Sequence, residues 1–457
     1  METSHPDLRE SVYQWQEYVE DLECYQPGGY HPTHIGDQHC NGRYEVVHKL
    51  GWGSYSTVWL ARDHKESRYV ALKIIVASSS ENCSEGRILR GLAAGKADHP
   101  GKSFVSSLLD EFFIDGPNGR HLCIVSEAAG CSLDRSKNGS STWLFPADVA
   151  RAISAQLLLG LEFIHSCGIV HGDLHPSNIL FTSSNLDGLT LEELYQRMGE
   201  PRKVPVERLD KQPNGPQAPN YAFMPAMIFT SAEDVVDARV VIADFGEAFV
   251  KTEERKKLNT PILLQPPEAF FNEQVDEAVD VWTLGCTLYK VLGDGPLFDG
   301  FIAVDQAWVL AEMISTLGSL PKRWWDQWEM KTDFLLEDGS WKKETHRPYG
   351  LYSRPLTERL SSMGRGEDPS TCEFSPGEMN ALENLLRAML TYEPSERIDA
   401  STALESEWME DWGRPAMRKL GFLTTVHCFF AKWSTTIFGI SIGYDIKFRA
   451  EQSIRDV

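Results

Sequence analysis

The chain has 457 residues, 42% of them hydrophobic, and its acidic residues exceed its basic ones by 66 − 44 = 22. This length and composition are typical of a globular protein with two or three domains or one large two-lobed unit. The acidic excess disfavours direct binding to nucleic acid and favours basic partners. The start, METSHPDLRE, lacks a secretory signal, and the nine cysteines show no regular framework. We therefore expect reduced thiols in a cytoplasmic and nuclear protein.

Two patterns of periodicity divide the chain. Between residues 44 and 77, YEVVHKLGWGSYSTVWLARD and RYVALKIIVA are rich in Val, Ile, Tyr and Trp, which predicts an antiparallel β-sheet. After about residue 145, apolar residues recur at spacings of three and four, as in PADVARAISAQLLLGLEFIHSCG, which predicts helices. We expect an α+β protein with a β-rich first lobe and an α-helical second lobe.

Two segments depart from these patterns. Residues 182–238 are dense in Pro and polar residues, which indicates an insertion or extended loop rather than a core element. Near the end, GFLTTVHCFFAKWSTTIFGISIGY is apolar, but His427 and Lys432 interrupt it, so no clean run of 18 apolar residues remains. We expect a packed or partly ordered tail and no membrane segment.

The first candidate site residues lie in the predicted sheet. In LGWGSYSTV, Gly51 and Gly53 flank a turn between two strands, and glycines let the backbone approach phosphate oxygens closely. In VALKII, Lys73 lies on a buried strand, where a charge needs an anionic partner. The phosphates of ATP would supply one, and Glu85 in SEGRILRGL would hold the lysine from a following helix. Read singly, Lys73 is equally well explained as an edge-strand lysine that reaches solvent, and Glu85 as an exposed carboxylate on a helix.

Two further motifs carry oxygen donors. In HGDLHPSNIL, Asp173 can orient a hydroxyl nucleophile and Asn178 can bind Mg²⁺. In VVIADFGEA, Asp244 lies at the end of an apolar strand and before a glycine, a position that suits a second ligand of Mg²⁺. Taken alone, the loop resembles small-molecule kinases of the aminoglycoside phosphotransferase type, because Gly172 and His175 stand where protein kinases usually have Arg and Lys. An inactive relative of either class is the third reading of this loop.

Motifs in the second half resemble eukaryotic protein kinases. QPPEAF is similar to the Ala-Pro-Glu motif of that family, which implies that Glu268 pairs with Arg397 in YEPSERIDA. VDVWTLGCTLYKVL resembles the buried central helix, in which Asp280 would hold the backbone of the catalytic loop. Small-molecule kinases of the aminoglycoside type generally lack this trio. The resemblance therefore implies a protein kinase fold with ATP and Mg²⁺ as cofactors.

Within the protein kinases, the chain most resembles the SR-protein kinases (SRPK family) of the CMGC group. The stretch EDLECYQPGGYHPTHIGDQHCNGRYEVVHKLGWGSYSTVWLARD carries pieces of that family in its order, and the similarity covers roughly residues 20 to 412. The resemblance implies an N-terminal extension over 1–42, an N-lobe over 43–127, a C-lobe over 128–413 with a spacer-like insertion at 182–238, and a tail over 414–457. The implied nucleotide-binding residues are Gly51, Trp52, Gly53, Ser54, Tyr55, Ser56, Val58, Ala71, Lys73, Glu127, Ala129 and Leu180, and the implied catalytic residues are Asp173, Lys73, Glu85 and His175, with Asn178 and Asp244 on the metal.

The same resemblance accounts for several oddities of the sequence. Ser56 in the third glycine position fits the family's own pattern, and so does Gly172 before the catalytic Asp. Without a cation at Gly172, a phosphate on the activation segment has no obvious partner, so we expect activity without activation-loop phosphorylation. The family binds Arg/Ser-rich segments, often of splicing factors, in an acidic C-lobe groove. In VDQAWVLAEMI, Asp305 and Glu312 would lie two turns apart on one helix face and dock such a peptide.

Four positions depart from the family pattern. His175 replaces a lysine that contacts the γ-phosphate, so transition-state stabilisation is expected to fall by about a few kcal/mol. Gln265 stands where these kinases tend to have Arg near the substrate-binding loop, which weakens the inferred preference for Arg/Ser repeats. Thr260 is the candidate for the loop threonine that contacts the catalytic Asp. Ser126 takes the place of a bulky residue behind adenine, which would leave that part of the nucleotide pocket open.

The sequence therefore predicts a serine/threonine protein kinase, acting as a monomer on basic Arg/Ser-rich proteins such as splicing factors. Two alternatives remain at this stage. The first is a pseudokinase scaffold that binds basic partners, against which the retention of all five polar catalytic residues argues. The second is a small-molecule kinase, which rests mainly on the catalytic loop.

Overall fold

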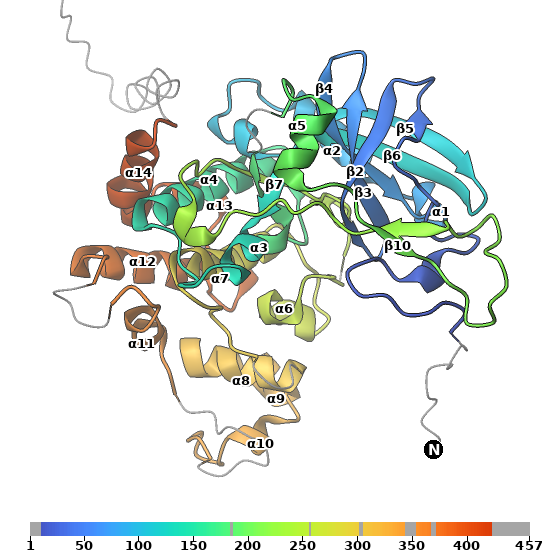
Figure 1. The fold of residues 1–457 in the computed structure, drawn as a ribbon. Coiled ribbons are helices and arrows are strands. Elements are labelled where there is room, and N and C mark those ends of the chain that lie inside the picture. Colours follow the sequence, from blue (N-terminus) through green and yellow to red (C-terminus); the bar gives the residue numbers. More distant parts are fainter. Residues whose placement is uncertain are drawn as a thin grey trace, which may run out of the picture.

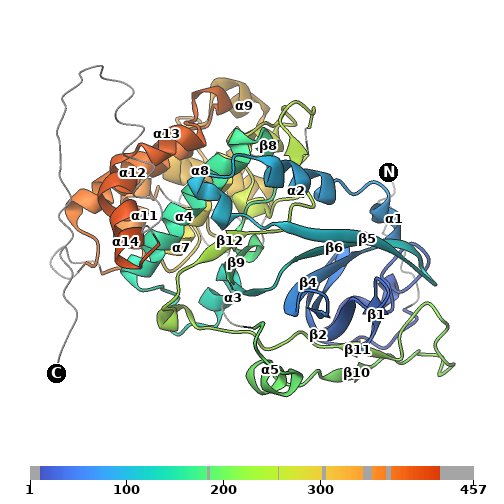
Figure 2. The same ribbon diagram turned by 90° about the horizontal axis from the view of Figure 1, so that it is seen from above.

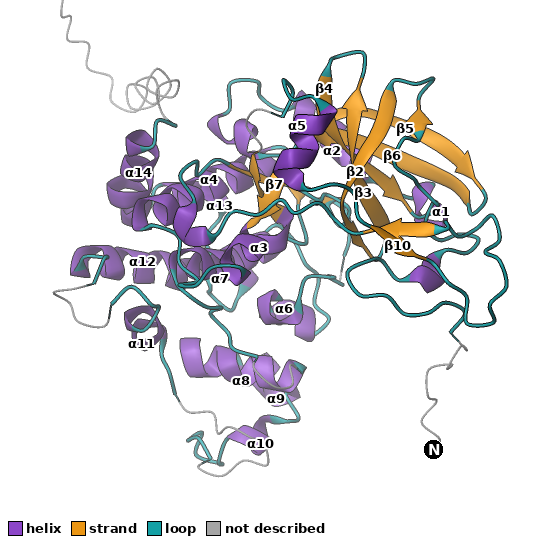
Figure 3. Ribbon diagram, in the orientation of Figure 1, coloured by secondary structure: helices purple, strands orange, loops and turns teal. Residues whose placement is uncertain are grey.

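A computed structural model describes residues 11–182, 186–255, 257–300, 305–342, 353–366 and 372–422. Figure 1 shows the chain as two lobes, and in Figure 3 most of the strands gather in one of them and most of the helices in the other. The predicted α+β, two-lobed fold is therefore confirmed. Most of the predicted tail, residues 423–457, and the first ten residues of the extension lie outside the described residues. Within the described ranges, no helix is long and apolar enough to cross a bilayer.

The small lobe is built on one antiparallel sheet. Its order is β1-β2-β3-β4-β6-β5. On β4, Val70, Leu72 and Ile74 are buried in one cluster, while the intervening Ala71 and Lys73 point to the opposite face. The strands are β1 (Gln38–His39), β2 (Tyr44–Gly53), β3 (Ser56–Asp63), β4 (Arg68–Ile75), β5 (Leu108–Gly116) and β6 (Gly119–Glu127), with helices α1 (Ala77–Ser80) and α2 (Glu85–Ala94) beside them.

The large lobe packs its helices around α4 (Ala147–Ser166) and α7 (Ala278–Leu292), most of whose residues are buried. Short antiparallel strands of this lobe flank the predicted catalytic motifs: β7 (Ala129–Ser132), β8 (Ile169–Val170), β9 (Ile179–Thr182), β12 (Val240–Ile242) and β13 (Phe249–Val250). The other helices are α3 (Leu133–Asn138), α6 (Pro267–Phe270), α8 (Gln306–Leu317), α9 (Lys322–Gln327), α10 (Lys331–Phe334), α11 (Leu356–Ser361), α12 (Pro376–Met389), α13 (Ala400–Leu404) and α14 (Arg414–Lys419).

The insertion at 182–238 differs from the expected extended loop. It contains α5 (Leu191–Met198) and the hairpin of β10 (Lys203–Pro205) and β11 (Tyr221–Phe223), which lie against the small lobe (Figures 1 and 2). Leu194 and Met198 pack with Val47 and Leu60 of the sheet. A local signal for α5 was present in the sequence, because Thr190 and Glu193 form a capping box. Much of the insertion therefore packs against the N-lobe, whereas Ala232, Val235 and Ala238 near its end are buried in the core of the large lobe.

The N-terminal extension also packs on this lobe. The carboxylate of Glu20 forms an ion pair with the ammonium of Lys49 on β2 and accepts a hydrogen bond from the hydroxyl of Tyr25. Both charged side chains are buried, and the Lys49 ammonium lies 5.3 Å from the centre of the Trp59 ring. Breaking such a pair would leave an uncompensated buried charge. The extension is thus anchored to the strand that leads into the glycine-rich turn.

In the large lobe, Glu268 and Arg397 form the predicted ion pair. The guanidinium donates two hydrogen bonds to the carboxylate, at 2.8 and 3.0 Å, and neither side chain is more than 1% exposed. Arg397 also donates to the carbonyls of Thr391, Tyr392 and Ala278. The pair therefore joins α6 to the start of α7 and to the segment before α13.

Arg397→Ala should lower the free energy of unfolding by about 3–5 kcal/mol, because it leaves the Glu268 carboxylate buried without a partner. Chemical denaturation measures this loss. Arg387→Ala is the matched control, since Arg387 pairs with Glu383 on the exposed face of α12. The control should cost less than about 1 kcal/mol. Equal losses in the two variants would contradict the structural role given to the Glu268 pair.

Candidate active site

Three charged residues from separate elements meet between the lobes. The Lys73 ammonium lies 2.7 Å from a carboxylate oxygen of Glu85 on α2 and 2.7 Å from one of Asp244. Burial alone would lower the pKa of Lys73, but the two carboxylates outweigh it and raise that pKa. The Lys73 ammonium in turn lowers the pKa of Asp244 to about 2. Burial raises the pKa of Glu85 against the pull of the same ammonium. The shifts of Lys73 and Asp244 favour the charged forms of both groups, as phosphate and metal binding require.

The glycine-rich turn lies opposite Lys73. In the sheet register, Gly51 is paired with Val58, and Val58 with Lys73, so the turn and the lysine belong to neighbouring strands. A Cβ atom added to Gly51 or Gly53 would meet no protein atom within 4 Å. Packing within the protein therefore does not require glycine at these positions, whereas a ligand lying against the turn would. This arrangement fits a nucleotide whose phosphates approach the backbone.

The other predicted nucleotide-binding residues lie at the turn itself and on β4, β6, β7 and β9. Ala71 is paired with Ser126 across β4 and β6, and both side chains are half-buried. Glu127 ends β6, and Ala129 begins β7, which is paired with the strand β9 that carries Leu180. Trp52, Ser54 and Tyr55 at the turn are exposed, whereas Ser56 is buried.

The catalytic loop brings Asp173 and Asn178 together. The side-chain amide of Asn178 donates to the Asp173 main-chain carbonyl at 3.0 Å and to its Oδ2 at 3.2 Å. The other carboxylate oxygen, Oδ1, is buried and has no hydrogen-bond partner among the described residues. This oxygen keeps an unused capacity to accept a hydrogen bond. The amide oxygen of Asn178 and the carboxylate of Asp244 are hard donors of the kind that Mg²⁺ prefers, and the ion would neutralise phosphate charge.

Asp280 holds the backbone of this loop, as the resemblance implies. Its carboxylate accepts hydrogen bonds from the main-chain N–H groups of His171, at 2.7 Å, and Gly172, at 2.9 Å, and it also contacts Nε2 of His165 at 2.9 Å. Gly172 has a φ of +75°, which glycine adopts without strain. Its Cβ, if present, would lie 3.0 Å from the Glu247 carbonyl oxygen. A glycine is therefore favoured here for local geometric reasons.

His175 lies beside the catalytic carboxylate. Its Nε2 is 3.5 Å from Oδ2 of Asp173, and its Nδ1 accepts a hydrogen bond from the main-chain N–H of Ser177 at 3.3 Å. Because Nδ1 is the acceptor, the proton of the neutral ring lies on Nε2 and faces Asp173. His175 therefore supplies one donor at the position of the usual lysine.

Thr260 lies in the activation segment, the stretch between Asp244 and Glu268, and it does not make the contact expected of it. The Thr260 hydroxyl donates a hydrogen bond to the Gly172 carbonyl at 2.9 Å rather than to the carboxylate of Asp173. The side-chain amide of Gln265 donates to the Thr260 carbonyl at 2.8 Å, so this residue stabilises the segment itself. Arg255 donates to the carbonyl and carboxylate of Glu247, both at 2.6 Å. Sequence reasoning missed Arg255, whose partner lies eight residues before it with no motif to mark the pair.

The predicted docking pair does not form one acidic surface. Glu312 is only 4% exposed, and its carboxylate accepts hydrogen bonds from Arg359, at 2.9 Å, and from the main chain of Asp299, at 3.1 Å. Asp305 is exposed and caps α8 by accepting a hydrogen bond from the Trp308 main-chain N–H. The expectation that Glu312 faces a basic peptide is therefore wrong, because the helical period does not reveal that Arg359 covers this face.

Comparisons with known proteins agree with this geometry. The protein kinase domain family matches residues 44–191 and 226–409, which is more than half of the chain, and the gap lies inside the insertion. Protein kinase dsk1 of Schizosaccharomyces pombe is 26% identical over 90% of this chain and 89% of its own length. The serine/threonine-protein kinase SRPK of Physarum polycephalum is 28% identical over 86% and 91%, respectively. SRSF protein kinase 3 of Homo sapiens is 39% identical over 36% of this chain and 30% of its own length.

The site lies within the segments that match the family. Lys73 on β4, Glu85 on α2, the loop with Asp173 and Asn178, and Asp244 all lie inside the matched segments. The chain belongs to the protein kinases, and among them it is a serine/threonine kinase of the SRPK type.

Proposed function

We propose that this kinase transfers the γ-phosphate of ATP to serines in Arg/Ser-rich segments of basic proteins such as splicing factors. The observation that carries the proposal is the unpartnered Oδ1 of Asp173, whose other carboxylate oxygen accepts a hydrogen bond from Asn178. Together with the Lys73–Asp244 ion pair, these residues make a complete set of groups for phosphoryl transfer to a hydroxyl. The acidic excess of 22 charges favours a basic substrate. The name of SRSF protein kinase 3 supports the same substrate class.

Each residue of the site would have its own role in phosphoryl transfer. Lys73, oriented by Glu85, would contact the phosphates, and Asn178 and Asp244 would hold Mg²⁺. Asp173 would accept a hydrogen bond from the serine hydroxyl and take up its proton as the oxygen attacks. His175 would donate from Nε2 towards the developing charge. A scaffold without catalysis has no need for an oriented base, so the geometry favours an active enzyme over a pseudokinase.

Purified protein incubated with labelled ATP, Mg²⁺ and an Arg/Ser repeat peptide should yield phosphoserine. Asp173→Ala should lower the rate by at least about 100-fold, because the substrate hydroxyl loses its base. A Glu/Ser repeat peptide of equal length is the matched substrate control and should react far more slowly. Nucleotide binding without transfer to any peptide or protein would instead indicate a pseudokinase.

We also propose that activity does not need a phosphorylated activation segment. Gly172 offers no cation to a phosphate, and the segment is tied down by other contacts, from Thr260 to Gly172 and from Arg255 to Glu247. Each contact is made by an unmodified side chain. These contacts support a segment that is ordered when the chain folds.

Phosphatase treatment should leave the peptide phosphorylation rate unchanged. Arg255→Ala should reduce it several-fold, because Arg255 makes hydrogen bonds to both the main chain and the carboxylate of Glu247. Arg87→Ala is the control, since the Arg87–Glu253 pair touches the same segment but is about half exposed and contributes little. A large loss of activity after dephosphorylation would refute the proposal.

His175→Lys should raise kcat by about tenfold, because an ammonium stabilises the transferring phosphoryl group better than a neutral donor does. Steady-state kinetics at saturating ATP and peptide measure this gain. His175→Gln is the control, since it supplies an uncharged donor and should give no gain. If the Lys variant is no faster than the natural enzyme, the histidine already provides all the stabilisation that the site can use.

A further inference from the structure

A tyrosine of the N-terminal extension contacts the glycine-rich turn. The hydroxyl of Tyr30 donates a hydrogen bond to the main-chain carbonyl of Gly53 at 2.8 Å. Gly53 ends β2 and is the second of the two glycines that the nucleotide phosphates would approach. Tyr30 lies outside the strands of the sheet and 23 positions before Gly53, so the hydrogen bond ties the extension to the turn.

Tyr30 is itself held rigidly. The side chain is 3% exposed, and its ring packs edge-on against Tyr25 with a centroid distance of 5.7 Å. Its main-chain N–H donates to the Cys24 carbonyl, and its carbonyl accepts from the side-chain amide of Asn118 at 2.7 Å. Burial raises the pKa of Tyr30, so the hydroxyl stays protonated and remains a donor. The ring therefore presents its hydroxyl from a fixed position.

The same part of the extension also contacts the helices that lead to Glu85. The carbonyls of Gly28 and Gly29 accept hydrogen bonds from the main-chain N–H groups of Ser78, at 2.8 Å, and Ala77, at 3.1 Å, in α1. A Cβ on Gly29 would lie 1.8 Å from the Cys24 carbonyl oxygen, so this close approach requires glycine. Figure 2 shows α1 and α2 along the same side of the sheet. The extension thus connects the glycine-rich turn to the segment before α2.

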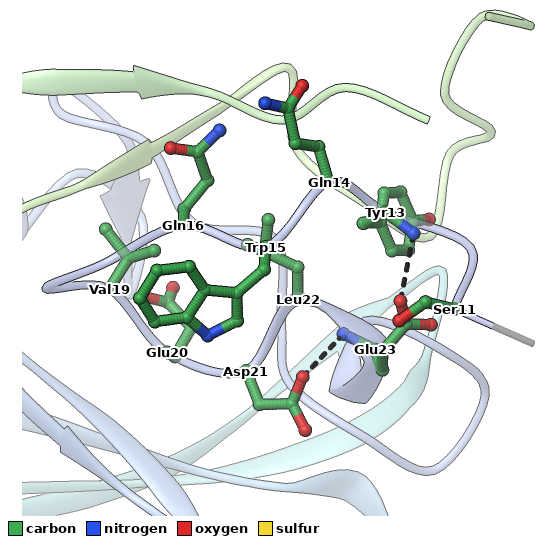
Figure 4. Close-up of a pocket in the computed structure, with 10 residues that line it drawn as sticks. All are labelled: Ser11, Tyr13, Gln14, Trp15, Gln16, Val19, Glu20, Asp21, Leu22 and Glu23. Atoms are coloured by element: carbon green, nitrogen blue, oxygen red, sulfur yellow. Dashed lines mark hydrogen bonds between the residues drawn. The ribbon is translucent and has the colours of Figure 1, made fainter. Parts of the chain in front are cut away.

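A second contact, the Glu20–Lys49 ion pair, keeps the extension in place. Glu20, whose carboxylate reaches Lys49, lines a hollow of about 400 Å³ formed by residues 11–23, together with Trp15 and Val19 (Figure 4). None of the predicted catalytic residues lines this hollow. The buried ion pair fixes the extension to β2 four residues before Gly53. The Tyr30 hydroxyl consequently acts on a turn whose preceding strand is already held.

We propose that Tyr30 is a positioning residue for the nucleotide. A glycine-containing turn loses much backbone entropy when it closes over phosphates. A hydrogen bond from a rigid segment to the Gly53 carbonyl orders the turn before the ligand arrives, so less entropy is lost on binding. Tyr30 touches no reacting atom and acts only through the backbone of the turn. The inference rests on the proposed use of ATP.

Tyr30→Phe removes this one hydroxyl and keeps the ring. The dissociation constant for Mg-ATP, measured by calorimetry on the full chain, should rise about three- to tenfold, as expected for the loss of one hydrogen bond. The KM for ATP should rise in parallel, with kcat at saturating ATP unchanged. Thermal unfolding of the variant reports whether the fold is retained.

Tyr25→Phe is the matched control. It removes a hydroxyl from the neighbouring ring in the same buried cluster, and that hydroxyl donates to Glu20 rather than to the turn. The control should bind Mg-ATP as the natural chain does. An unchanged dissociation constant in Tyr30→Phe would overturn the proposal, and so would an equal rise in both variants, because that would indicate a general loosening of the cluster.

This measurement is separate from the substrate assay. If the natural chain binds Mg-ATP but does not phosphorylate Arg/Ser peptides, the proposed substrate class is wrong. The role of Tyr30 is then still decided by the dissociation constants of Tyr30→Phe and Tyr25→Phe for Mg-ATP. A natural chain that binds no Mg-ATP would overturn the role proposed for Tyr30.

Discussion

The buried carboxylate of Asp280 is the constraint on which the active site depends. It lies in the first turn of α7, where the partial positive charge of the helix N-terminus favours an anion. Two main-chain N–H groups of the catalytic loop bind to it, so the loop is fixed to the most buried helix of the large lobe. From this fixed loop, His171 contacts the Ala243 carbonyl at 3.1 Å and packs its ring on Phe245. One carboxylate therefore sets the positions of both Asp173 and Asp244.

The sequence could predict those site residues whose chemistry requires a particular residue type at a particular position in a motif. The predicted site residues lie in short recognisable motifs: Lys73 on a strand, Glu85 at the start of a helix, and Asp173, Asn178 and Asp244 in loops next to short strands. Periodicity also predicted the division into a β-rich and an α-helical lobe. In these cases local pattern and function coincide.

What the sequence could not predict depends on contacts between distant residues. The spacing of Asp305 and Glu312 says that both lie near one face of a helix, but the partner of Glu312 comes 47 residues later. The polar composition of residues 182–238 is typical of a loop, yet a few apolar side chains such as Leu194 suffice to bury it against the sheet. Composition averages over a segment, whereas packing depends on individual side chains.

The insertion has a mechanical consequence for the whole molecule. In a two-lobed enzyme with a single connection between the lobes, the lobes can rotate about a hinge at that connection. Here the chain leaves β9 of the large lobe, packs on the small lobe and returns to β12, which is paired with β9. Together with the connection between β6 and β7, the backbone thus passes between the lobes three times. Three crossings at separate places oppose rotation of the lobes about any single axis more strongly than one connection would.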